Sequence, residues 1–358
     1  MKARDRYGVV PPPPHTQTLV HVECSLKHSL ETHVDAVNAA VLLSRAQAVS
    51  ASSDGTAVVW GLRAEGVGVQ HVLAAGGGRV WAIAASEGVE GEGNLVASAH
   101  HDGSVRVWDS SSGALTATLD KSDGEIKALA FSRAPPPAPS GGRVGRGSLI
   151  LAVGSTDRKL LLWRLISPST EADFPADACR GGGGGAERPG GGERVCGWVK
   201  VASLTGHSGT IVALAFAPVV SAGCDEQPMM RLVSGSYDRT ARVWEIGSQE
   251  RGAKEVLGLR GHNHWVMSVS FSRCALRVCS GSYDRTVRIW NAISGEVLHA
   301  IDAHSDRVMS VDCVGWGGRG RGGGLVVSGS YDKTCKFWDL ESGREVGCIS
   351  SCHTGEVS

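Results

Sequence analysis

The sequence lacks three features that often classify a chain: a net charge, a long apolar run and a paired-cysteine motif. Its 36 basic residues balance its 36 acidic residues, so charge gives no reason to expect a polyanionic partner or a membrane surface. No apolar run is long enough to span a membrane or to act as a secretory signal. The ten cysteines contain no C-x-x-C pair, which suits reduced thiols better than a disulfide framework. We therefore expect a cytoplasmic or nuclear protein that is not attached to a membrane.

The sequence does contain one motif that occurs six times. The clearest copies, "LVSGSYDRTARVW", "RVCSGSYDRTVRIW" and "LVVSGSYDKTCKFW", end at Trp244, Trp290 and Trp338, and weaker copies end at Trp60, Trp108 and Trp163. Each copy has two short β-branched segments around a polar turn, which is typical of a β-hairpin. An apolar alternation precedes each hairpin and another follows it, so each unit predicts four antiparallel strands. Four-stranded units with a period of about 40 to 50 residues favour an all-β fold of radially arranged sheets, a β-propeller.

Polar residues recur at fixed distances from the tryptophans. An Asp lies six residues before the Trp in all six copies, and a Ser lies ten residues before it in five. On these residues the chain resembles the WD-repeat propeller family, with six complete repeats and an incomplete seventh over residues 24–358. The resemblance implies that His, Ser, Asp and Trp of one repeat form a hydrogen-bonded tetrad. The implied tetrads are His33, Ser50, Asp54 and Trp60; His207, Ser234, Asp238 and Trp244; His262, Ser280, Asp284 and Trp290; and His304, Ser328, Asp332 and Trp338.

The second and third repeats depart from this pattern. Gly76 and Ser122 stand where the other repeats have the His, and Val153 replaces the Ser of the third repeat. A missing partner leaves a polar group unsatisfied at a cost of about 1 to 3 kcal/mol. We therefore expect these two blades to be the looser ones.

Ser, His and Asp together also suggest a hydrolase triad, but the set recurs in four separate units, each with its own Trp, and no G-x-S-x-G elbow presents a nucleophile. Metal-ligand candidates are the His100–His101 pair and Cys348 with Cys352 and His353, which lack the second cysteine pair of a zinc ribbon. The G-x-G-x-x-G match at 318–323 precedes no predicted helix. We expect no catalytic residues, no metal and no cofactor.

The predicted insertions all lie at one end of the blades. Rich in Gly, Pro or Ser, they are expected to be flexible loops and cover residues 134–147, 166–197, 219–230 and 315–324. The connections before strand one and between strands two and three lie at the opposite end and hardly vary in length. The domain prediction is a disordered extension at 1–23 followed by the propeller at 24–358.

Closure of the ring is less complete than the repeats suggest. Residues 24–30 match the fourth strand of a preceding blade, and the segment from 353 onward begins a seventh unit. Two strands of that seventh blade are missing from the pattern. Because unpaired sheet edges can pair with another chain, this blade is a candidate for edge pairing with a partner.

Aromatic residues make up only 5% of the chain, yet three of its four tyrosines stand directly before the turn Asp. We expect this position to lie beside the residues three and five places after the His, at the end of the blade whose loops keep their length. Trp, Tyr, Met and Arg are enriched at interface cores. The predicted partner-binding face consists of Arg79, Trp81, His101, Tyr237, Trp265, Met267, Tyr283, Arg307, Met309 and Tyr331. Its expected groove on blades four to six is anchored by Trp265, Tyr283 and Tyr331.

Function has to be inferred from this face, because the propeller fold hosts many functions. We expect a non-catalytic scaffold that binds a protein or peptide. One alternative is the substrate-recognition subunit of a ubiquitin ligase, a common role in the family that requires an adaptor-binding domain. Another is RNA binding through Arg-Gly loops at Arg143, Arg146, Arg319 and Arg321, which the sequence disfavours because few aromatic residues adjoin them.

Overall fold

The computed structural model describes residues 32–44, 46–63, 66–74, 76, 78–86, 94–132, 149–166, 197–218, 230–247, 252–315 and 324–350. Within these ranges all regular structure is β, in six four-stranded sheets. Blade one comprises β1 (Val37–Ser44), β2 (Gln47–Ser52), β3 (Thr56–Arg63) and β4 (Gly66–Ala74), and blade two comprises β5 (Val80–Ala85), β6 (Leu95–His100), β7 (Val105–Asp109) and β8 (Leu115–Leu119). Blade three comprises β9 (Ile126–Phe131), β10 (Ile150–Ser155), β11 (Leu160–Ile166) and β12 (Gly197–Leu204), and blade four comprises β13 (Ile211–Phe216), β14 (Met230–Ser236), β15 (Thr240–Ile246) and β16 (Ala253–Arg260). Blade five comprises β17 (Val266–Phe271), β18 (Arg277–Ser282), β19 (Thr286–Asn291) and β20 (Val297–Asp302), and blade six comprises β21 (Val308–Gly315), β22 (Gly324–Ser330), β23 (Cys335–Asp339) and β24 (Glu345–Ile349).

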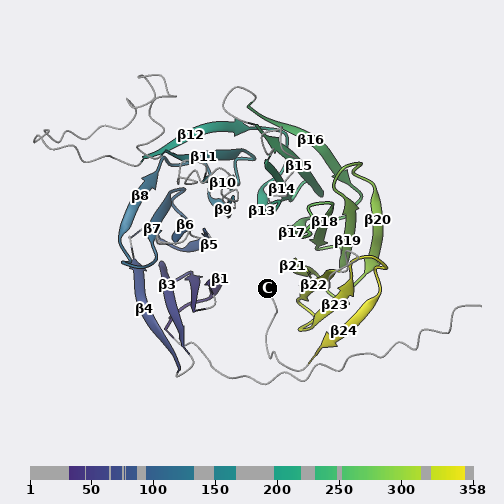
Figure 1. Ribbon diagram of the computed structural model, residues 1–358, viewed down its shortest axis with the longest axis horizontal. Helices are drawn as coiled ribbons and strands as arrows, with labels where there is room; N and C mark the ends of the chain where they lie inside the picture. Colours follow the sequence, from purple (N-terminus) through teal and green to yellow (C-terminus); the bar gives the residue numbers. More distant parts are fainter. Residues whose placement is uncertain are drawn as a thin grey trace, which may run out of the picture.

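The blades stand around a common centre, as Figure 1 shows, with the first strand of each sheet innermost and the fourth outermost. Second strands such as β6 and β10 are buried along their whole length, because both faces of the sheet meet a neighbouring blade. Along outer strands such as β20, exposed side chains are interspersed with half-buried ones. In every blade the register between the third and fourth strands shifts immediately before the Trp. Such a bulge bends the strand and re-aims the side chain that follows it.

The hydrophobic core lies between blades rather than within one. Among the described residues, five buried clusters each join two consecutive blades. Between blades five and six, for example, Cys279 and Ile289 of one sheet pack with Val308 and Trp338 of the next, and none of the four is more than 4% exposed. Each blade is therefore stabilised mainly by its neighbours.

Among the described residues, no such neighbour packs on the outward faces of blades one and six. Val37 is 51% exposed, whereas the residues at its place in the other five blades are at most 1% exposed: Val80, Ile126, Ile211, Val266 and Val308. At the other end of the arc, Phe337 is half-buried. The residues that precede the Trp in the other blades are 0% exposed: Val59, Val107, Leu162, Val243 and Ile289. Figure 1 shows these two blades as the ends of the arc.

The prediction of an all-β propeller with four-stranded antiparallel blades is confirmed for six blades. Residues 1–23, 24–30 and 353–358 lie outside the described ranges, so the extension, the seventh blade and its edge pairing stay predictions. The strands reach one residue into the predicted insertions at Ile166, Gly197, Met230, Gly315 and Gly324, and the remainder of those insertions also lies outside the described ranges.

The partly exposed outward face of blade six leads to a prediction about stability. Ile289→Ala should lower the free energy of unfolding by about 2 to 5 kcal/mol, because it removes a side chain packed between two blades. Phe337→Ala should cost less, although Phe is larger, because its side chain is only half-buried and no described blade lies over it. Urea unfolding of both variants measures the difference. An equal or larger loss for Phe337→Ala would mean that its face is covered.

Candidate functional site

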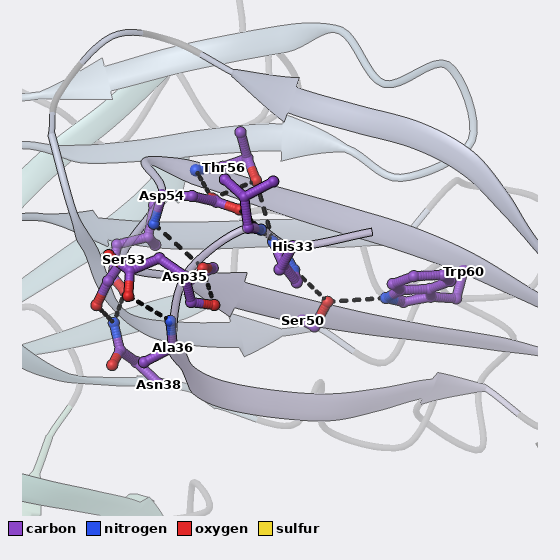
Figure 2. A network of polar contacts seen from close by, with 12 residues as sticks. His33, Asp35, Ala36, Asn38, Ser50, Ser53, Asp54, Thr56 and Trp60 are labelled. Atoms are coloured by element: carbon purple, nitrogen blue, oxygen red, sulfur yellow. Dashed lines mark hydrogen bonds and ion pairs between the residues drawn. The ribbon is translucent and has the colours of Figure 1, made fainter. Parts of the chain in front are cut away.

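A chain of hydrogen bonds crosses the first blade from its turn to its Trp (Figure 2). Nδ1 of His33 lies 2.9 Å from Oδ2 of Asp54, and Nε2 lies 2.8 Å from Oγ of Ser50. Nε1 of Trp60 donates to the same Oγ at 2.8 Å. The Thr56 hydroxyl and backbone N–H both donate to the other carboxylate oxygen of Asp54, at 2.6 and 2.8 Å. The linker before strand one is thereby tied to the turn between strands two and three.

The same chain recurs in blades four, five and six. The Nδ1–Oδ2 distances are 2.6, 2.9 and 2.9 Å, the Nε2–Oγ distances are 2.7, 2.7 and 2.8 Å, and the Trp Nε1–Oγ distance is 2.8 Å in each. The structure thus brings together His207, Ser234, Asp238 and Trp244; His262, Ser280, Asp284 and Trp290; and His304, Ser328, Asp332 and Trp338.

The donors and acceptors fix the charge state of each member. A carboxylate can only accept, so Nδ1–H of His262 donates to Asp284, and Nε2 accepts from the Ser280 hydroxyl. Burial alone would raise the pKa of Asp284, but hydrogen bonds from His262 and Thr286 outweigh burial and hold the pKa well below its usual range. For a His, burial acts in the opposite direction, and it lowers the pKa of His304 because it disfavours the charged imidazolium. In blade six the tetrad therefore pairs an ionised Asp332 with a neutral His304.

The order Asp, His, Ser in each tetrad is also the order of a hydrolase triad. The hydroxyls of the later blades cannot reach a substrate, however, because Ser234, Ser280 and Ser328 are 0% exposed. Each hydroxyl oxygen already accepts the indole N–H of its Trp. A nucleophile needs access to the scissile bond and a free lone pair. The tetrads are therefore structural.

Blade two has an imidazole that sequence reasoning missed. Nε2 of His100 lies 2.9 Å from Oγ of Ser98, which also accepts the Trp108 indole N–H at 2.9 Å. His100 is buried within β6 and supplies from the second strand what Gly76 cannot supply from the linker. The signal was present, because the residue eight before the Trp is Ser in the other five repeats and His only here. Blade two thus keeps a chain of hydrogen bonds from His100 through Ser98 to Trp108, and the expectation that this blade is looser stays a prediction.

In blade three, smaller groups stand at the tetrad positions. The Ser122 hydroxyl donates to Ser155 Oγ at 3.1 Å and reaches Asp157 at 3.3 Å. Val153 at the Ser position is 1% exposed and packs in the apolar cluster between blades two and three. This blade keeps a longer, weaker version of the link between linker and turn.

The turn face, defined as the linkers before strand one together with the turns between strands two and three, is held by a repeated backbone bond. In each case the N–H of the residue before the turn Asp donates to the carbonyl of the residue three after the His position. The bonds join His101 to Arg79 (2.8 Å), Tyr237 to Thr210 (3.0 Å), Tyr283 to Trp265 (3.0 Å) and Tyr331 to Arg307 (3.1 Å). Side chains of these pairs therefore start from adjacent points of the backbone, as the sequence spacing predicts.

Contacts between neighbouring blades then join these pairs into a row across blades four to six. The Tyr237 ring stacks on Trp265, with 4.2 Å between centroids and 17° between planes. Trp265 lies 5.1 Å from Tyr283. The Arg307 guanidinium lies 4.7 Å from the Tyr283 centroid and 5.6 Å from that of Tyr331. We call Tyr237, Trp265, Tyr283, Arg307 and Tyr331 the ladder.

The ladder includes most, but not all, of the predicted face on these blades. Its four rings are half-buried and Arg307 is exposed. Met267 and Met309 are half-buried on β17 and β21, next to the ladder in sequence. The sequence reasoning missed His264, whose ring stacks on Tyr283 at 5.4 Å and meets Trp265 edge-on at 4.9 Å.

The predicted face of blade two forms a separate cluster with blade three. Nζ of Lys127 lies 3.3 Å from the Trp81 ring centroid, and Glu125 accepts from both Lys127 (2.7 Å) and His101 (2.8 Å). His101 therefore points away from the buried His100, so the pair does not converge on one site. Among the described residues, no group of three His, Cys, Asp or Glu side chains could hold a metal ion. No helix of the described ranges is long and apolar enough to cross a membrane.

The six four-stranded blades with their repeated polar network define a β-propeller of the kind built from tetrad-bearing repeats. Four segments of the chain match the family model "WD domain, G-beta repeat": residues 69–109, 198–245, 253–291 and 295–339. The chain belongs to the WD-repeat family, whose members generally act as non-catalytic scaffolds that bind proteins. Each matched segment begins within, or at most two residues before, the fourth strand of one blade and ends in the third strand of the next.

One curated relative is Ribosome assembly protein 4 of Saccharomyces cerevisiae. It is 37% identical to this chain over 70 residues, which is 20% of this chain and 11% of the yeast protein. The matched segment thus spans only a small part of the relative.

The tetrad geometry predicts the effect of removing one imidazole. His262→Ala should lower the free energy of unfolding by about 1 to 3 kcal/mol, because Asp284 and Ser280 lose a buried partner. Ser122→Ala is the matched control in blade three, where the hydrogen bonds are 3.1 and 3.3 Å long and the loss should be smaller. Urea unfolding gives both values, and equal losses would contradict the assigned role of His262.

Blade two predicts a dependence of stability on pH. Burial and the charge of Arg106 lower the pKa of His100 from 6.5 to about 4, and its Nδ1 faces the Gly78 carbonyl without a good hydrogen bond. The unfolded chain therefore takes up this proton below pH about 6.5 while the folded chain resists it, so stability is complete above that pH and falls towards pH about 4.

His100→Gln keeps a polar group near Ser98 that does not titrate in this range. The free energy of unfolding of this variant should change less than that of the wild type between pH about 7 and about 4.5. The tetrad carboxylates begin to lose their contribution to stability below pH about 5, but both proteins contain them, so this loss cancels in the comparison. Parallel curves for variant and wild type would rule out His100 as the source.

Proposed function

We propose that this propeller is a non-catalytic interaction scaffold and that its ladder holds a peptide segment of a partner protein. The observation that carries this proposal is the continuity of Tyr237, Trp265, Tyr283, Arg307 and Tyr331 across three blades. Aromatic rings offer a large contact area at low cost in conformational entropy. Half-buried rings fixed by neighbours are already organised for binding, which removes part of the cost of ordering them.

The tetrads support this role indirectly. Each ties a linker to a turn, and those are the two segments that carry the ladder residues. The hydrogen bonds of the tetrad therefore fix the backbone beneath the proposed face. A rigid element under a binding site keeps its side chains in place better than a free loop does.

The proposal also concerns the location of the protein and two alternative roles. Cytoplasm or nucleus is the proposed location, and none of the five described cysteines forms a disulfide. In the alternative role, as the substrate-recognition subunit of a ubiquitin ligase, the same face would bind the substrate and the ligase adaptor would be a second partner. RNA binding through Arg143, Arg146, Arg319 and Arg321 falls outside the described residues. The name of the yeast relative concerns ribosome assembly, and the short match gives no reason to assign that process to this chain.

The proposal is tested with a displayed library of random peptides panned on the full chain. Trp265→Ala with Tyr283→Ala should abolish enrichment of the dominant peptides, because the double change removes the middle of the ladder. Its melting temperature should barely move, since both side chains are half-buried at the surface.

The matched control is Leu276→Ala with Ile293→Ala. These are large side chains of the same blade, 54% and 62% exposed, at turns on the opposite end of the blade. This control should retain peptide enrichment. Equal enrichment on the wild type and on a folded ladder variant would refute the proposed face.

A further inference from the structure

The turns that adjoin the ladder carry basic residues in a strained backbone conformation. Arg239, Arg285 and Lys333 have φ values of 69°, 71° and 69°, and Arg158 of blade three has 71°. Blades one and two place Gly55 and Gly103 at this position, with φ values of 88° and 80°. A left-handed φ suits Gly and is unfavourable for residues with a Cβ. Four blades thus hold an exposed cation where Gly would relieve the strain.

The acidic residues of these turns lie beneath the cations and are bonded to other partners. The side chains of Asp238, Asp284 and Asp332 are only 5 to 9% exposed, and each is engaged by a His and a Thr. Over the segments 205–210, 237–239, 261–265, 283–285, 303–307 and 331–333, the exposed charges are those of Arg239, Arg285, Arg307, Lys333 and Asp306. The closest contact of Asp306 with Arg307 is a long 3.9 Å. At the surface of these segments four exposed cations stand against one exposed anion, while the ionised carboxylates of the three turn Asp residues lie beneath them.

The faces of the aromatic rings between these cations are largely covered by neighbouring side chains. Trp265 stacks against Tyr237, and Tyr283 lies between His264 and the guanidinium of Arg307. Binding of a nucleobase depends on an open ring face on which the base can stack. The edges of aromatic rings carry partial positive charge and suit carboxylate oxygens. A basic face whose ring faces are already engaged favours an acidic peptide over a nucleic acid.

We infer that the ladder and its turns bind an acidic peptide segment, whose Asp or Glu carboxylates pair with the cations while its apolar side chains lie against the rings. The paired cations are Arg239, Arg285, Arg307 and Lys333. This inference rests on the proposed function, because it names the chemistry of the partner at the same face. Exposed ion pairs of this kind are individually weak and are screened by salt, so affinity should fall as salt rises.

The decisive variant is Arg239→Gly with Arg285→Gly. Gly already occupies this turn in blades one and two, so the variant should fold and melt at the same temperature as the wild type or higher. Loss of two ion pairs should weaken binding of an acidic peptide about tenfold. Arg158→Gly makes the same backbone change in blade three, away from the ladder, and should leave affinity unchanged.

Two probes are used with the full chain. The first is the random peptide library: peptides that need the intact ladder should be enriched in Asp and Glu. The second is a short fluorescein-labelled peptide of alternating glutamate and leucine, measured by fluorescence anisotropy beside its lysine counterpart and a uridine oligonucleotide. The glutamate peptide should bind best, and more weakly to the Arg239→Gly, Arg285→Gly variant.

The outcomes separate the two proposals. Peptides that depend on the ladder but are neutral or basic would overturn the inference of an acidic partner and leave the face intact. Absence of any ladder-dependent peptide would overturn the proposed function itself. Equal or tighter binding of the uridine oligonucleotide, or unchanged affinity of the glutamate peptide for the Gly variant, would also overturn the acidic-peptide inference.

Discussion

The interaction on which the rest of the structure depends is the imidazole held between a carboxylate and a hydroxyl. It joins three segments of one repeat: the linker before a blade, the turn between its second and third strands, and the Trp of its third strand. Because all the groups are buried, loss of any one leaves others unsatisfied. The backbone of the turn face is therefore fixed from beneath, and the side chains above it are free to vary between blades.

That division explains how a symmetric fold carries an asymmetric surface. The tetrads of blades four, five and six are nearly superimposable in their distances, yet the residues three after the His are Thr210, Trp265 and Arg307. The residue before the turn Asp of one blade meets the residue three after the His of the next blade. The rule holds both for Tyr237 with Trp265 and for His101 with Glu125. A contact row is therefore determined by pairs of residues in adjacent repeats rather than by one repeat alone.

The fold and the membership of each tetrad follow from spacing, because a backbone that repeats places equal offsets at equal positions. The adjacency of Tyr283 and Trp265 also follows from spacing, since both are tied to one backbone hydrogen bond. His100 could have been found by comparing repeats column by column, but its role depends on a side chain that reaches the same hydroxyl from another strand. The stacking of Tyr237 on Trp265 and the position of Arg307 between two rings depend on the angle between blades. No offset within one repeat encodes that angle.

The repeat in the sequence and the blade in the structure are offset by one strand. A matched segment such as 253–291 supplies the outermost strand of blade four and the three inner strands of blade five. Each seam between blades is consequently crossed by a continuous covalent segment as well as by side-chain packing. Gene duplication of one such segment would lengthen the arc by a whole blade and leave every internal sheet with its full set of strands. The offset thus lets blade number change in single steps without creating an unpaired edge inside the arc.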